Sequence, residues 1–82
     1  MQATKPTTAK SIHTMPEALV IILVDRGVRI RWKDCSPRLA AATTEERLRA
    51  ELSPGGYGIH WPLIDEDLSV GGLLRCCEAA SK

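Results

Sequence analysis

The chain has 82 residues, and its 11 basic and 10 acidic side chains give a formal net charge of +1. A chain of this length forms one small domain with a thin core, burying about 60% of its unfolded surface. The near-neutral charge excludes a strong polycation, and the apolar run at residues 18–24 is too short to span a membrane. The polar, threonine-rich start has no apolar secretion segment, so a cytoplasmic protein is expected.

The charges are polarised along the chain. Residues 1–49 hold nine Lys or Arg against five acidic residues, whereas residues 50–82 hold two against five. Such polarity favours an oppositely charged protein partner or head-to-tail contacts between copies. The odd number of cysteines, with no CxxC spacing, is typical of reduced cytoplasmic thiols; these are Cys35, Cys76 and Cys77.

The N-terminal part predicts a tail and then strands. Residues 1–10 are polar and aperiodic, which indicates a flexible tail. An edge strand over residues 11–15 is compatible with the pattern that follows. Residues 19–25 are a continuous, mostly β-branched run, typical of a central strand that is buried on both faces.

The next segment alternates between apolar and basic residues. A turn signal at residues 25–27 ends in Gly27, which is free to adopt positive φ. Beyond it, one strand face carries Val28, Ile30 and Trp32, and the other carries basic side chains. Residues 19–33 are therefore predicted to form an antiparallel hairpin with one half-exposed strand.

Thr43 and Glu46 have the spacing of a helix capping box, in which each side chain satisfies the other's backbone N–H. This signal predicts a helix over residues 43–52 that packs on the sheet. In that helix Leu48 and Leu52 are expected to face the sheet, and Arg47 and Arg49 to face water.

The C-terminal part predicts one more strand and one more helix. A glycine-rich stop at residues 53–58 leads into a strand over residues 57–61, which Pro62 ends. Ser69 is suited to cap a short helix over residues 69–77. The expected organisation is a tail (1–10), one α+β domain with a small antiparallel sheet (11–77) and a C-terminal tail (78–82).

Three blocks, in this order, resemble the bacterial domain-of-unknown-function 2442 family over residues 12–75. They are Ser36-Pro37-Arg38-Leu39, residues 42–47, and residues 58–70 followed by Leu73-Leu74; the most specific is the third, which reads GIHWPLIDEDLSV. The resemblance implies a small α+β domain with an antiparallel sheet and no known enzymatic activity. It also implies relatives encoded beside a second small protein, an arrangement like that of toxin–antitoxin pairs.

The family block contains a histidine and three nearby acids, which suggests acid–base or metal chemistry. The alternative is structural. If Ile59 and Trp61 pack in the core, then His60 faces outward or lies beneath a loop, and Asp65 or Asp67 caps the last helix. The residues of this candidate motif are His60, Trp61, Asp65, Glu66 and Asp67.

A second candidate surface is the basic face of the hairpin. Its residues are Arg26, Arg29, Arg31, Lys33 and Arg38. They suit phosphates or an acidic protein partner, although charged side chains on a strand also simply prevent edge pairing. No aromatic residue lies on this face to stack on bases.

The leading hypothesis is a non-enzymatic interaction module of a bacterial or mobile-element gene pair. Its expected partner is a small protein, with a homodimer as an option, and no membrane is involved. Nucleic-acid binding by the basic face is the alternative, and metal or acid–base chemistry at His60 with Asp65, Glu66 and Asp67 is third. No catalytic residue, cofactor or bound metal is expected.

Overall fold

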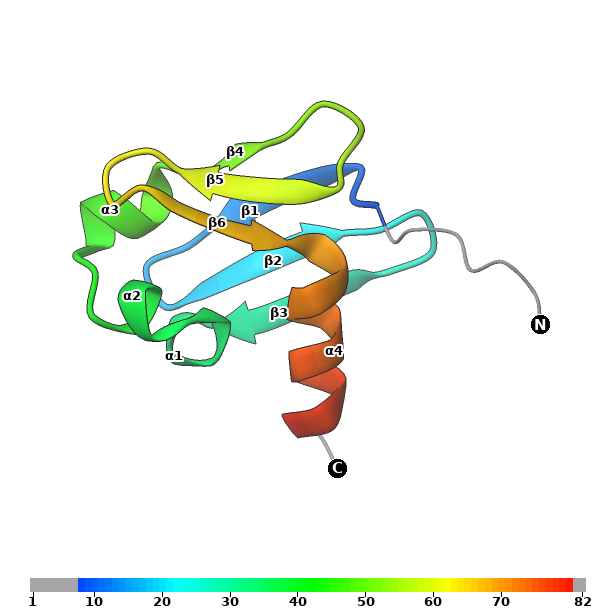
Figure 1. Ribbon diagram of the computed structural model, residues 1–82. Helices are drawn as coiled ribbons and strands as arrows, with labels where there is room; N and C mark the ends of the chain where they lie inside the picture. The colour runs from blue at the N-terminus through cyan, green and yellow to red at the C-terminus, as the bar shows by residue number, and fades with distance from the viewer. Residues whose placement is uncertain (1–7, 81–82) are drawn as a thin grey trace.

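The computed structural model describes residues 8–80 and consists of two three-stranded antiparallel sheets with short helices (Figure 1). The first sheet, in the order β1-β2-β3, contains β1 (Ser11–Thr14), β2 (Ala18–Ile22) and β3 (Gly27–Arg31). The second, in the order β4-β5-β6, contains β4 (Glu51–Leu52), β5 (Gly58–Trp61) and β6 (Glu66–Ser69). The helices are α1 (Trp32–Cys35), α2 (Pro37–Ala40), α3 (Thr44–Leu48) and α4 (Val70–Ala80). The α+β class is confirmed, but the expected single sheet is wrong.

The hairpin predicted over residues 19–33 is confirmed in its pairing. β2 is the central strand of its sheet, and Leu19 lies opposite Ile30 on β3. Both side chains are buried, as is Ile21. The expectation that both faces of the strand are buried is wrong, because Val20 and Ile22 on its second face are only half-buried, and β2 ends at Ile22, before the exposed Val24. One face of this sheet covers the core, and the other is open to water.

The second strand of the hairpin ends earlier than predicted. β3 stops at Arg31, and the chain turns directly into α1, so Trp32 and Lys33 are helical. Trp32 is nevertheless buried, and its indole Nε1 donates a hydrogen bond of 2.8 Å to the carbonyl of Met15. The turn of helix keeps the large side chain in the core. Gly27 does not adopt positive φ; Gly55 and Gly56 do.

The capping box is confirmed, but the helix after it is half as long as predicted. Thr43 Oγ1 accepts from the Glu46 amide (3.2 Å), and Glu46 accepts from the Thr43 amide (2.9 Å). α3 ends at Leu48, and the chain extends into β4, which pairs with β5. Leu48 is therefore exposed, whereas Leu52 packs against the core from a strand.

Arg47 does not simply face water, as was expected. Its guanidinium donates to the carbonyls of Leu39 (2.9 Å) and Ala40 (2.8 Å) at the end of α2. The last carbonyls of a helix have no partner within the helix. Arg47 therefore joins α3 to α2 through the carbonyls of the last turn of α2, of which that of Leu39 also accepts from the Ala42 amide at 3.2 Å.

The two chain ends also differ from expectation. Ala9 is buried, and its amide donates to the Gly56 carbonyl, so the fold begins before residue 11. Ser69 caps α4 as predicted, accepting from the Gly72 amide at 2.9 Å. α4 continues to Ala80 rather than ending at residue 77. Residues 1–7 and 81–82 of the expected tails lie outside the described residues.

The core lies where the two sheets face each other. It combines Leu19, Ile21 and Ile30 from one sheet with Ile59 and Trp61 from the other. α1 contacts β3, and α4 contacts both β6 and α1. These helices therefore lie together at the edges of the sheets that β3 and β6 form (Figure 1). Within residues 8–80, no helix is long and apolar enough to cross a membrane.

Candidate functional site

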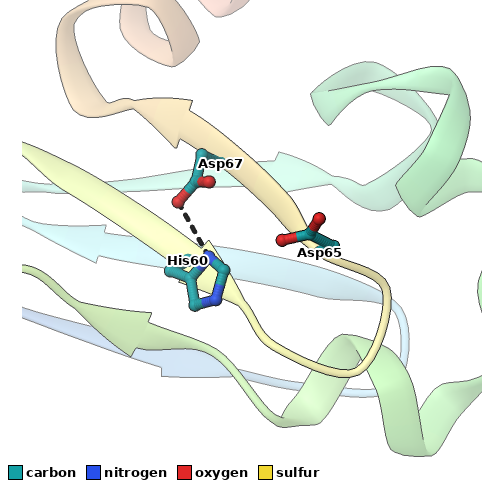
Figure 2. Close-up of side chains that lie close together, drawn as sticks. All are labelled: His60, Asp65 and Asp67. Atoms are coloured by element: carbon teal, nitrogen blue, oxygen red, sulfur yellow. Dashed lines mark hydrogen bonds and ion pairs between the residues drawn. The ribbon is translucent and has the colours of Figure 1, made fainter.

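The polar part of the family block lies on the outer face of the second sheet. Ile59 and Trp61 are buried, so the alternation of β5 turns His60 away from the core, as predicted. In the register, His60 lies opposite Asp67 on β6. His60 Nδ1 is 2.8 Å from Asp67 Oδ1, and Figure 2 shows the two side chains meeting across the strands.

Asp65 joins this pair from the turn between β5 and β6. Its φ of 53° lies in the left-handed region, which Asp tolerates better than most residues. The candidate ligand atoms of His60, Asp65 and Asp67 all lie within 4.8 Å of one another. One imidazole nitrogen and two carboxylates, which can hold a proton or a divalent cation, thus come together from three consecutive segments. The expectation that Asp65 or Asp67 caps the last helix is wrong, because Ser69 does so.

Trp61 and Glu66 do not belong to this cluster. They lie opposite each other in the register, with the Trp61 side chain fully buried. The Glu66 side chain is only 19% exposed and forms an ion pair with Arg38, with Nε to Oε1 at 3.8 Å. The predicted five-residue motif is therefore divided between an outer polar cluster and the core side of the sheet.

Glu51 is a residue that the sequence analysis missed. It lies on β4, opposite His60, so its exposed side chain is on the same outer face. His60 therefore has an acidic neighbour on each adjacent strand. No local signal indicates this arrangement, since residues 43–52 read as a helix and the relationship depends on pairing of β4 with β5.

The structure does not bring the predicted basic residues together on one strand face. Arg29 and Arg31 are exposed on β3, but Lys33 lies in α1 and Arg38 in α2. Arg29 is 3.6 Å from Glu17, and Arg31 is 3.5 Å from Asp34. Arg26, in the β2–β3 turn, pairs with Asp25 at 3.3 Å. These acidic neighbours lower the positive potential that phosphate binding requires.

A shallow groove of about 250 Å³ with apolar and charged lining residues lies near the end of α3. It is open to solvent and is lined by Leu48, Arg49, Ala50, Glu51, Pro62 and Leu63. Leu48 and Leu63 are 39% and 53% exposed. The groove joins the α3–β4 connection to the β5–β6 turn, and this juxtaposition is not visible in the sequence.

The two facing sheets and the short helices define a small α+β domain, with the polar cluster and the groove on its surface. The chain belongs to the family described as "Protein of unknown function (DUF2442)", whose model matches residues 9–79. The fold is similar to the crystal structure of a protein of unknown function from Rhodospirillum rubrum ATCC 11170. The TM-score is 0.75 at 22% identity, over 87% of this chain and 88% of that one. No curated protein matches the sequence.

Proposed function

We propose that this protein is a non-enzymatic protein-binding module whose partner docks in the groove beside α3. The observation that carries the proposal is the exposure of Leu48 and Leu63 on either side of this groove. Exposed aliphatic side chains around a concavity gain free energy when a partner removes them from water. Arg49 and Glu51, which also line the groove, supply charges of both signs for orienting that partner.

The neighbouring strand favours an extended partner segment. β4 is an edge of its sheet, paired on one side with β5. An edge strand presents backbone N–H and C=O groups to which another chain can add as a strand. We therefore expect the partner to contribute an extended segment, with an aliphatic side chain placed in the groove.

In this proposal the partner is a small protein encoded beside this one in a bacterial or mobile-element gene pair. A second copy of this chain is the alternative occupant. Nucleic-acid binding has weaker support, because Arg29 and Arg31 already have acidic neighbours within 4.0 Å.

The test compares the wild-type protein with Leu63→Asp. The immobilised wild-type protein captures partners from a lysate of the native host, and mass spectrometry identifies them. Calorimetry then measures the affinity of the purified partner for the wild type and for Leu63→Asp. The Asp substitution places a charge in an apolar contact, so we expect affinity to fall at least about tenfold, by roughly 1.4 kcal/mol. Light scattering on the protein alone measures self-association.

Val24→Asp is the matched control, because Val24 is the most exposed large aliphatic residue described but does not line the groove. We expect this variant to bind as the wild type does. Equal binding by Leu63→Asp, or loss of binding in Val24→Asp alone, would contradict the groove as the docking site.

A further inference from the structure

The side chains of His60, Asp65 and Asp67 meet the first requirement of a metal site. Their ligand atoms already lie within 4.8 Å of one another. Metal–nitrogen and metal–oxygen bonds of about 2.0–2.2 Å place adjacent ligands about 3 Å apart. The 2.8 Å between His60 Nδ1 and Asp67 Oδ1 is close to that spacing. Small side-chain rotations are therefore enough to direct both atoms at one ion.

The charges of the cluster also favour a cation. With a neutral imidazole, the two aspartates contribute a charge of −2, and Glu51 adds a third carboxylate on the same sheet face. Within residues 8–80, neither Asp65 nor Asp67 forms an ion pair with Lys or Arg. Glu66 differs, because Arg38 lies beside it. In the part of the chain that the structure describes, no lysine or arginine is thus paired with the two aspartates that would hold the ion.

The histidine distinguishes this cluster from a purely acidic patch. An imidazole nitrogen favours first-row transition metals, whereas Ca²⁺ and Mg²⁺ prefer oxygen ligands alone. Binding an ion replaces the 2.8 Å hydrogen bond between His60 Nδ1 and Asp67 Oδ1, because the neutral ring must take the tautomer with its proton on Nε2 and direct the Nδ1 lone pair at the ion. The strand pairing fixes the Cα positions of His60 and Asp67 before an ion arrives, which lowers the cost of ordering the ligands.

We propose that His60, Asp65 and Asp67 bind a divalent first-row transition-metal ion on the outer face of the second sheet (Figure 2). The His60 and Asp67 side chains are 38% and 75% exposed. Water therefore completes the coordination shell, and the site binds with modest affinity. None of the three proposed ligands lines the groove; only Glu51 belongs to both surfaces.

Mn²⁺ is the probe of choice, because it suits carboxylate and imidazole ligands and avoids the thiolate binding that the three cysteines offer to Zn²⁺. Amide signals of the full chain are followed by NMR during titration with MnCl₂. We expect paramagnetic broadening to begin at β5, the β5–β6 turn and β6. Asp67→Asn and His60→Ala each change a proposed direct ligand. Since loss of an outer-shell partner already weakens metal binding roughly tenfold, each variant should weaken Mn²⁺ binding by at least that factor.

His13→Ala and Asp34→Asn are matched controls. His13 is an exposed histidine on β1, and Asp34 is an aspartate paired with Arg31. Both variants should bind Mn²⁺ as the wild type does. If His60→Ala unfolds, the isosteric Asp65→Asn and Asp67→Asn variants provide the test. Broadening spread evenly over the acidic surface, or binding that these two Asn variants leave unchanged, would overturn the proposal.

Discussion

Trp32 and Trp61 form an edge-to-face pair at the centre of the molecule, with ring centroids 6.1 Å apart and ring planes at 83°. Trp32 begins α1 beside one sheet, and Trp61 ends a strand of the other. Each indole N–H donates to a backbone carbonyl, of Met15 at 2.8 Å and of Arg47 at 3.2 Å. The pair therefore links the two sheets to the β1–β2 turn and to α3 in a thin, otherwise aliphatic core.

Replacement of Trp61 by Ala should severely destabilise the protein. The substitution removes a fully buried side chain, its ring contact and the partner of the Arg47 carbonyl, and such changes cost about 3–5 kcal/mol. Urea denaturation followed by far-UV circular dichroism measures the loss. Tyr57→Ala is the control, because Tyr57 is 53% exposed, and its free energy of unfolding should change by less than about 1 kcal/mol.

Gly56→Ala should be more harmful than Gly55→Ala. Both glycines have positive φ, of 78° and 87°, so Ala is strained at either position by about 1–2 kcal/mol. A Cβ at Gly56 would also collide with the backbone of Ala9, whereas one at Gly55 meets the exposed Tyr57 ring, which can rotate away. Thermal unfolding of the two variants tests this order, and an equal loss in both would contradict it.

Arg47→Ala should lower the free energy of unfolding by about 1.5 kcal/mol, because two carbonyls at the end of α2 lose a charged donor. Arg47→Lys should retain only part of this stabilisation, since an ammonium lacks the planar guanidinium geometry. Arg49→Ala is the matched control, with an expected change within about 0.5 kcal/mol. Arg49 forms an exposed i,i+4 pair with Glu45. Equal effects at the two positions, measured in urea, would count against the role of Arg47.

Thr43→Ala should cost about 1 kcal/mol, because it removes the hydroxyl that accepts from the Glu46 amide. Thr43→Ser keeps that oxygen and should behave nearly as the wild type. The neighbouring Thr44→Ala removes a hydroxyl inside the helix and is expected to be neutral or slightly stabilising. A Thr44→Ala loss as large as that of Thr43→Ala would show that the cap is not the cause.

The sequence determined the features that depend on short-range patterns. Alternation and a turn signal predicted the β2–β3 hairpin, and Thr43 with Glu46 predicted the capping box. The spacing of Ile59 and Trp61 predicted that His60 faces outward. In each case the side chains that matter are neighbours along one element, so local periodicity or capping is sufficient to place them.

The tertiary structure alone decided that β4 and β6 are strands and that they pair with the predicted strand β5 in a second sheet. β4 is two residues long, and β6 reads Glu-Asp-Leu-Ser, a sequence with little intrinsic strand preference. Both are strands because β5 offers backbone partners on its two sides. That pairing shortened the predicted helix, placed Glu51 and Asp67 beside His60, and left Leu48 beside the groove. Hydrogen bonding between neighbouring strands of one sheet thus outweighed local propensity, and it placed the candidate site where no single segment could.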